Sequence, residues 1–298
     1  MSTSRITPFA SSKQAIKDSS YSFVVRVIAS SFAPLFVLFF TSCALRIEPL
    51  PKVNFKNKLA AKQSSALLSI LSDEAATFKS GRLLYKVSAH RGKRHEGFRY
   101  ALALLQPNNL RLDLLPTIGA YTLSILTYDG CRAVLLNPRE HTAEVSSDIN
   151  SLLLKTLGFN ISIEDLFYLI AGRPSPDFLK KSELFWTRPQ NGSTADLLFI
   201  NRQKYIYWLY DSTKAHFKKA YIANPYSGTA SIVIMFSSFE QGISLSFPKK
   251  IVLRDQRAAL TVELTLKKKT INKPIAKNLF KIDVPDNFKV SLGSFTPP

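Results

Sequence analysis

The sequence predicts one large, mainly β domain whose antiparallel sheet curves around a short helical plug. Three observations support this prediction. Apolar residues alternate with period two through residues 82–145, two short apolar helical segments follow at 147–172, and strand-like segments then continue to residue 284. A composition that is 46% apolar and 20% charged is typical of a globular chain. No internal repeat or shift in composition divides it, which favours a single domain.

Residues 1–42 are expected to be a lipoprotein signal peptide. The apolar segment 28–41 is shorter than the roughly 20 residues of a membrane-spanning helix, and basic residues precede it. Small residues stand directly before Cys43, as in a bacterial lipobox, so Cys43 is the expected site of lipid attachment. An uncleaved anchor with an ordinary buried cysteine is the alternative. We expect a tether over 43–54 and the domain over 55–298.

Residues 55–79 place apolar side chains at helical spacing and predict one amphipathic helix. Packing against the sheet is the expected role of this helix, and contact with a membrane surface is the alternative. Four alternating segments follow and predict an antiparallel meander: 83–89, 98–104, 110–114 and 121–125. Turn residues separate them at Gly92, at Pro107-Asn108-Asn109 and at Asp129-Gly130.

Two short helices interrupt the strands. Ser147 or Asp148 can cap the first, which Gly158 ends. Ser162 and Asp165 form a capping box at the start of the second, and a Gly-x-Pro sequence stops it. Both helices are apolar around most of their circumference, so one side of each can face the sheet while the other meets a further apolar surface.

Strands are then expected to resume at 183–188, 195–200, 205–210, 231–236, 243–253, 259–267 and 279–284. An aromatic cluster lies among them, and we expect strand core or cavity wall in preference to a docking patch: Trp186, Tyr205, Tyr207, Trp208 and Tyr210.

The net charge of +19 is compatible with nucleic acid, anionic lipid or an acidic protein as partner, and also with a merely solvated basic surface. Basic clusters occur at 90–95 and 267–269, where we expect them to solvate hairpin ends or contact lipid headgroups. Nucleic acid is not expected for a secreted lipoprotein. The chain has two cysteines and four histidines, in no metal-binding frame, and lacks the common nucleophile and phosphate-binding motifs. We therefore expect no metal, no cofactor and no enzymatic activity.

One strand continues into an apolar loop, where a hairpin normally carries polar residues. The loop consists of Leu115, Pro116, Thr117, Ile118 and Gly119. It can fold back onto the core, or it can project as an apolar finger that enters a membrane or another apolar surface.

Three stretches of the chain together carry a family resemblance. Residues 110–119 lead a strand into the apolar loop, 126–130 form a strand with an Asp-Gly turn, and 157–174 pair a Leu-Gly helix end with an apolar helix that stops at Gly-x-Pro. In this order they resemble LolB, the outer-membrane lipoprotein receptor family within the LolA/LolB superfamily of lipoprotein carriers. The likeness covers about residues 80–178.

The resemblance implies an incomplete antiparallel β-barrel of about eleven strands, covered by short α-helices, with an apolar cavity for acyl chains. It implies that Leu115–Gly119 insert into the membrane, with Ile118 at the position of the family's exposed leucine. We expect six residues to cover or line the acyl cavity: Leu152, Leu153, Leu157, Leu166, Phe167 and Ile170.

By the same resemblance, the protein accepts lipoproteins and inserts them into the outer membrane of a Gram-negative bacterium, on the face toward the periplasm. Its expected partners are a periplasmic LolA-like chaperone, the lipoprotein cargo and outer-membrane lipid, and acyl chains are the transported ligand. It is expected to act as a monomer. The alternative is an anchored interaction or assembly scaffold that binds a protein on the same fold. A lipid-modifying enzyme would instead need a convergent His, Asp or Ser cluster in the cavity.

Overall fold

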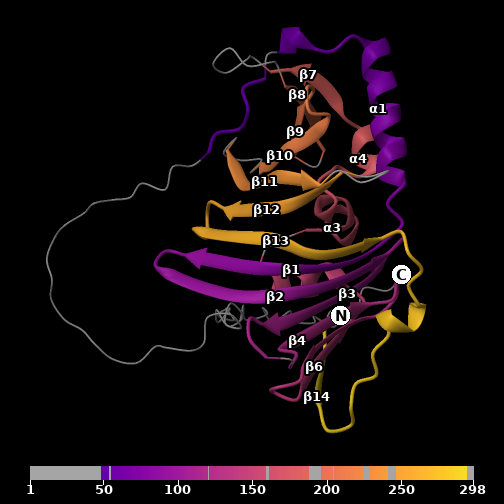
Figure 1. Cartoon of the computed structure of the whole chain (residues 1–298), viewed down its shortest axis with the longest axis vertical. Helices are drawn as coiled ribbons and strands as arrows, with labels where there is room; N and C mark the ends of the chain where they lie inside the picture. Colours follow the sequence, from indigo (N-terminus) through magenta and orange to yellow (C-terminus); the bar gives the residue numbers. More distant parts are fainter. Residues whose placement is uncertain are drawn as a thin grey trace, which may run out of the picture. The chain divides into compact units, whose positions relative to one another are not determined.

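The computed structural model describes residues 48–53, 55–119, 121–158, 161–187, 196–203, 205–223, 229–240 and 246–293. All of them belong to one compact unit, Ala44–Pro298. Within these residues a single open sheet holds fourteen strands (Figure 1). The strands of the first half are β1 Ser80–Arg91, β2 Arg94–Leu105, β3 Asn109–Pro116, β4 Ser124–Tyr128, β5 Ala133–Asn137 and β6 Thr142–Ser146. Those of the second half are β7 Glu183–Trp186, β8 Leu197–Asn201, β9 Ile206–Asp211, β10 His216–Ala223, β11 Ala230–Glu240, β12 Phe247–Asp255, β13 Leu260–Ile271 and β14 Lys289–Leu292.

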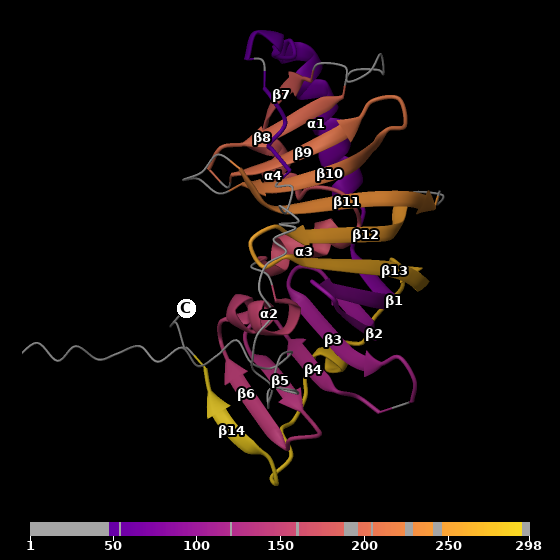
Figure 2. The same ribbon diagram turned by 90° about the vertical axis from the view of Figure 1, so that its left-hand side faces the viewer.

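The sheet consists of two antiparallel meanders joined at its centre. Its order is β14-β6-β5-β4-β3-β2-β1-β13-β12-β11-β10-β9-β8-β7, so β1 pairs with both β2 and β13. Only the pairing of β14 with β6 is parallel among the described strands. The chain crosses from β6 to the far edge at β7 through three helices, α2 Ile149–Leu157, α3 Ile163–Ile170 and α4 Pro176–Lys180 (Figure 2).

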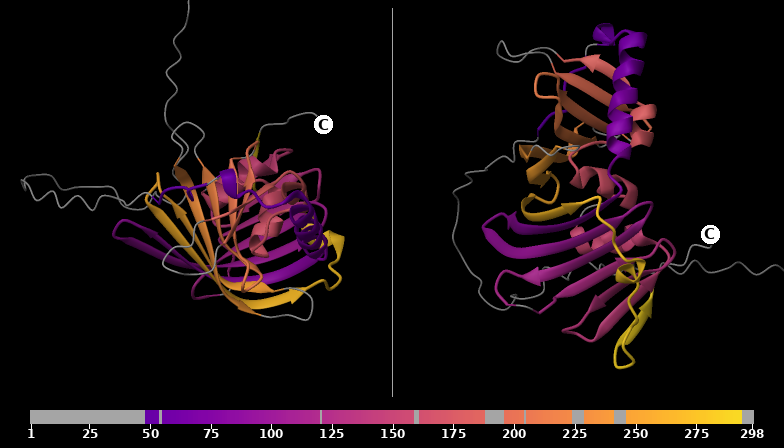
Figure 3. Two further views of the ribbon diagram at one scale, coloured as in Figure 1. Left: turned by 90° about the horizontal axis from the view of Figure 1, so that it is seen from above. Right: turned by 45° about the vertical axis from the view of Figure 1, so that its right-hand side comes forward.

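The main core lies between one face of the sheet and these helices. Because successive strand residues point to opposite faces, Leu102 and Leu104 on β2 and Leu110 and Leu112 on β3 share the inner face and are buried. The helices contribute Leu152 and other buried residues to the same cluster. Figure 3 shows the sheet curving around the helices, which lie on its concave side. The predicted class, a mainly β sheet around a helical plug, is confirmed.

The two ends of the described chain cover parts of the outer face. Residues 275–288 pack against β2 and β4–β6, where Ile275 and Phe280 cover Ala103, and Val284 packs beside Val134. Val53 and Leu50, before the first helix, pack on the outer face of β7–β11. Residues 48–53, expected to be part of a tether, therefore contact the sheet.

Several predicted element boundaries are wrong. The helix expected over 55–79 is divided into a 3₁₀ turn, η1 Phe55–Asn57, and α1 Ala61–Ala76. The strand expected from Tyr121 begins at Ser124. Residues 279–284 are not a strand, because they end a 3₁₀ turn, η2 Lys277–Phe280, and then extend over the outer face without pairing. The sheet also contains strands that were not predicted: β5, β6, β10 and β14.

Candidate functional site

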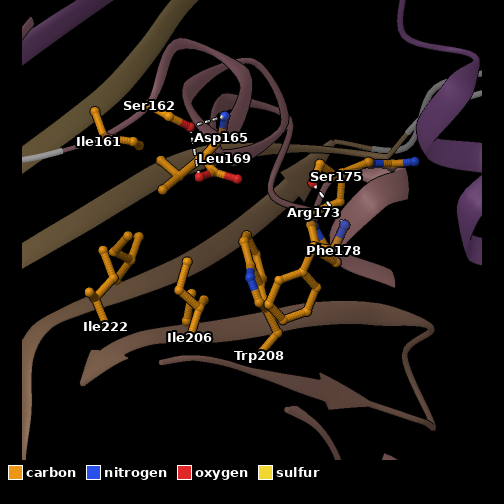
Figure 4. Close-up of a pocket in the computed structure, with 13 residues that line it drawn as sticks. Ile161, Ser162, Asp165, Leu169, Arg173, Ser175, Phe178, Ile206, Trp208 and Ile222 are labelled. Atoms are coloured by element: carbon orange, nitrogen blue, oxygen red, sulfur yellow. Dashed lines mark hydrogen bonds between the residues drawn. The ribbon is translucent and has the colours of Figure 1, made fainter. Parts of the chain in front are cut away.

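A cavity of about 290 Å³ lies between the helical crossing and the concave face of β9, β10 and β11. Its helical side carries Ile161 and Leu169, and Ile206, Trp208 and Ile222 face them from the strands (Figure 4). The lining residues are Ile161, Ser162, Asp165, Leu169, Arg173, Pro174, Ser175, Phe178, Ile206, Trp208, Ala220, Ile222 and Ile234. Most of this wall is aliphatic or aromatic, which suits an apolar ligand.

The capping box predicted at the start of α3 forms one edge of the cavity. Ser162 Oγ accepts a hydrogen bond from the Asp165 backbone N–H at 3.1 Å and donates to Asp165 Oδ2 at 2.7 Å. Ser175 caps α4 in the same way, since its Oγ accepts from the Phe178 N–H at 3.2 Å. These polar side chains beside the cavity therefore satisfy helix N–H groups and leave an apolar wall for a ligand.

The turn from α3 to α4 brings this wall close to the sheet. Gly172 has φ +70°, and a Cβ at this position would lie 3.0 Å from Pro248 Cγ. A side chain would therefore both strain the backbone and push the turn away from β12. The sequence predicted that α3 stops here, but not α4, although Ser175-Pro176 is a typical N-cap with proline at the first helical position.

Arg173 is the one arginine among the lining residues, and it is largely buried. Its Nη2 donates to the Ser246 carbonyl at 3.2 Å, and Nη1 lies 4.0 Å from Glu74 Oε2 on α1. Nε has no hydrogen-bond partner within the described residues. Burial lowers the pKa of Arg173, and the nearby Glu74 carboxylate opposes this shift. The contacts tie the turn to α1 and to the segment that precedes β12.

Aromatic rings form the floor of the cavity. Trp208 stacks on Phe236 with ring centroids 5.5 Å apart and meets Phe178 and Phe217 edge to face. The expectation that the aromatic cluster forms core or cavity wall is confirmed for Trp208 and for the buried Tyr210. Tyr205 is 46% exposed, so the cluster is not continuous.

The six residues expected to cover or line an acyl cavity lie elsewhere in the core. Leu152, Leu153, Leu166, Phe167 and Ile170 are buried in the main cluster, and Leu157 packs half-buried against it. None of the six lines the cavity described here. Their role in acyl binding stays a prediction. Of the strand residues of the cavity, only Trp208 was expected in a core or cavity wall. Ile206, Ala220, Ile222 and Ile234 were missed because they come from a part of the chain distant from the helices, and no local pattern joins the two.

The apolar loop after β3 projects its isoleucine into solvent. Ile118 is 87% exposed, whereas Leu115 and Pro116 are half-buried at the end of β3. Arg99 on β2 holds the loop, since its Nε donates to the Pro116 carbonyl at 3.0 Å and its Nη2 to the Gly119 carbonyl at 2.9 Å. The isoleucine does not fold back onto the core, so this alternative is wrong for Ile118.

Among the other chemistry-bearing residues, His90 and His95 meet on the β1–β2 hairpin, where Ser88 Oγ lies 3.0 Å from His90 Nε2 and 2.8 Å from His95 Nε2. Cys131 and His141 do not come together. Cys131 is exposed in the turn before β5, and His141 stands in the turn after it, so the whole of this five-residue strand lies between them. No group of three or more His, Cys, Asp or Glu side chains among the described residues could hold a metal ion. No helix in the described part of the chain is long and apolar enough to cross a membrane. Cys43 lies outside the described residues.

Comparison with known proteins gives a likeness of fold. No protein-family model matches, and no curated protein matches. Among solved structures, a DUF1329 family protein from Desulfovibrio piger matches with a TM-score of 0.52 and 11% identity, over 74% of this chain and 96% of that one.

Two further structures match less well. A putative outer membrane lipoprotein-sorting protein domain from Vibrio parahaemolyticus has a TM-score of 0.48 at 12% identity, over 73% and 97% of the two chains. A LolA superfamily protein from Nitrosomonas europaea has a TM-score of 0.47 at 10% identity, over 72% and 97%. The comparisons do not single out the LolB family that the sequence resembles. The chain thus shares with the DUF1329 family protein a mainly β fold built on an open sheet with short helices.

Proposed function

We propose that this protein binds acyl chains of lipoproteins and passes them to the outer membrane, as an acceptor anchored through lipid on Cys43. The observation that carries this proposal is the cavity between α3, α4 and strands β9–β11, whose walls are mainly apolar while Ser162 and Ser175 serve as helix caps. Burial of an acyl chain is favourable by about 0.8 kcal/mol per methylene, so a dry apolar cavity is what such a carrier needs.

The size of the cavity indicates how binding proceeds. About 290 Å³ is slightly less than the smallest typical small-molecule pocket, since these range over roughly 300–1,000 Å³, so the cavity holds part of one chain. Larger cargo requires α2 and α3 to move away from the sheet. That movement exposes Leu152, Leu153, Leu166, Phe167 and Ile170, which are the residues expected to line an acyl cavity.

The remaining components of the proposal concern delivery. A LolA-like periplasmic chaperone donates the lipoprotein, and the exposed Ile118 inserts into outer-membrane lipid on the face toward the periplasm. The protein acts as a monomer and carries out no chemistry on its cargo.

A protein-binding scaffold is the second candidate, and the sheet edge is the observation that favours it. The four residues of β14 are all exposed, including Val290 at 54% and Leu292 at 74%. An exposed edge strand can pair with an extended peptide from a partner.

Native mass spectrometry of residues 44–298, secreted without the anchor, tests the proposal. Every core cluster of the described residues lies within 48–293, so this part keeps the whole core. Co-purified acyl lipid, or binding of an added triacylated peptide, is the expected result. The cavity-filling variant Ala220→Leu should bind less. A protein that carries no lipid and rejects the triacylated peptide overturns the carrier proposal and favours the scaffold.

A further inference from the structure

Three turns meet at one end of the sheet, which we call the entry rim. They are the β1–β2 turn at Gly92-Lys93, the β3–β4 loop that contains Ile118, and the β12–β13 turn at Gln256–Ala259. Strand pairing brings them together, because Phe98 pairs with Pro116 and Arg91 pairs with Leu260. The β1–β2 hairpin extends past its neighbours at the left of Figure 1, and again at the far left in the first view of Figure 3.

The chain also enters the described fold at this rim. The Glu48 backbone N–H donates to Gln256 Oε1 at 2.7 Å, and its carboxylate accepts from Lys219 Nζ at 2.6 Å. The next residue, Pro49, bridges to Thr229, directly before β11. Cys43 precedes Glu48 by five positions, and a fully extended chain of that length reaches at most about 18 Å. Lipid attached at Cys43 would hold the rim within that reach of a membrane.

Unpaired positive charge covers the tip of the hairpin. Residues 90–97 are all exposed, and they include Arg91, Lys93 and Arg94 against the single carboxylate of Glu96. No carboxylate of the described residues forms an ion pair with any of the three cations. Arg257 adds a fourth cation on the β12–β13 turn, where Asp255 accepts hydrogen bonds from backbone N–H groups.

Exposed apolar side chains lie beside these charges. Ile118 is 87% exposed and Tyr121 is 60% exposed, on the loop that follows β3. An aliphatic side chain with a tyrosine nearby is suited to the boundary between headgroups and acyl chains, where tyrosine places its ring in the apolar layer and its hydroxyl in water. Basic residues around such an apolar tip are attracted to anionic headgroups.

We infer that the entry rim is the surface on which this protein docks to a bilayer that contains anionic phospholipid. Ile118 and Tyr121 enter the interface, and Arg91, Lys93 and Arg94 contact lipid phosphates. This inference rests on the proposed delivery to a membrane. It adds two claims: that the lipid recognised is anionic, and that the entry rim is the end of the sheet that faces the membrane. The chain entry, the hairpin charges and the apolar loop are three separate observations that indicate the same end.

Vesicle co-sedimentation of residues 44–298 tests this docking surface. The probe is a vesicle of phosphatidylglycerol mixed with phosphatidylcholine, compared with phosphatidylcholine alone. Binding should require phosphatidylglycerol and weaken with salt. The triple variant Arg91→Gln/Lys93→Gln/Arg94→Gln should bind at least about tenfold more weakly. The matched control neutralises three exposed lysines at the opposite end of the strands, Lys267→Gln/Lys268→Gln/Lys273→Gln, and should keep most of the binding.

Equal losses in the two triple variants would show that net charge alone drives adsorption and would overturn the inference. Unchanged binding of the hairpin variant would overturn it as well, as would binding to an acidic protein or nucleic acid but not to vesicles. All these side chains are exposed, so unchanged thermal unfolding verifies that each variant folds. A positive vesicle result without acyl cargo in the mass spectrum would leave the docking surface standing while the carrier proposal fails.

Cys131, the one cysteine within residues 44–298, gives a test of orientation. Cys131 lies in the β4–β5 turn, at the opposite end of β4 from the Ile118 loop. An environment-sensitive dye on Cys131 should report water when the protein is bound to the mixed vesicles. The same dye on Ile118→Cys, in a Cys131→Ser background, should report the bilayer interface. The reverse pattern would contradict docking through the entry rim.

Discussion

Replacement of Ile118 by glutamate is expected to slow delivery and to spare both the fold and cargo binding. The side chain is 87% exposed and makes little contact with the core, so the free energy of unfolding should change by less than about 0.5 kcal/mol. Insertion of an isoleucine into an apolar phase is favourable by about 1.5–3 kcal/mol, which corresponds to a roughly 10- to 150-fold loss of membrane affinity when it is removed. The assay is transfer of a triacylated peptide from the loaded protein to vesicles.

The control is Ile70→Glu, on α1. Ile70 is also an exposed isoleucine, at 57%, but it lies on the helix at the right of Figure 1, away from the entry rim. It should transfer cargo at the rate of the unmodified protein. If Ile118→Glu transfers as fast as the control, the loop does not insert and the reasoning is refuted. If Ile118→Glu also loses cargo, the loop belongs to the binding site instead.

Three further substitutions test the packing around the cavity and the core. Ala220→Leu adds three carbons at a residue that lines the cavity. It should raise the free energy of unfolding by about 0.5–2 kcal/mol, and the melting temperature with it, while lowering acyl binding; a drop in stability would mean that the space is already filled. Tyr85→Phe removes a buried hydroxyl without a hydrogen-bond partner in the described structure, and urea unfolding should show a gain of about 1 kcal/mol. A loss there would reveal a partner for this hydroxyl. Ser162→Ala deletes the capping box of α3 and should cost about 1 kcal/mol in the same measurement; an unchanged midpoint would show that the cap contributes nothing.

The elements that the sequence predicts well are those specified by neighbouring residues. Asp148, one of the two residues predicted as the cap, caps α2 through the Asn150 N–H at 3.0 Å, and Gly158 ends the helix in the left-handed conformation at the predicted position. The capping box of α3 also forms as predicted. Such signals involve residues within one helical turn of each other, so they are visible in the sequence.

Two of the strands that were missed, β10 and β14, lack a regular alternation of buried apolar and exposed polar residues. In β10 the pairing with β9 shifts between Phe217 and Lys219, and this irregularity breaks the period of two. The four residues of β14 are exposed at the sheet edge and bury no apolar face. Residues 279–284 were predicted to be a strand and are not one. Their apolar residues Ile282 and Val284 alternate because they cover the outer face of the sheet, without pairing with a strand.

The cavity could not be predicted from sequence because its two walls are distant along the chain. Leu169 and Arg173 come from the helical crossing, whereas Ile206, Ala220 and Ile234 come from strands that follow later. The two walls come together only in the folded sheet, in which β9, β10 and β11 are neighbours and contribute residues to the same cavity as α3. An apolar interior between helices and sheet was predicted, but the residues expected to line an acyl cavity were those of the helices, and Trp208 was the one cavity residue anticipated from the strands.

The pairing at the centre of the sheet has a consequence for how the chain folds. Gly81 on β1 pairs with Ile271 on β13, so the two halves of the sheet join through residues about 190 positions apart. The first meander can form before the rest of the chain has folded, but its edge at β1 stays open until β13 arrives. Folding should therefore be slow, and during that interval β1 offers an unpaired edge to other chains, which exposes the partly folded protein to aggregation.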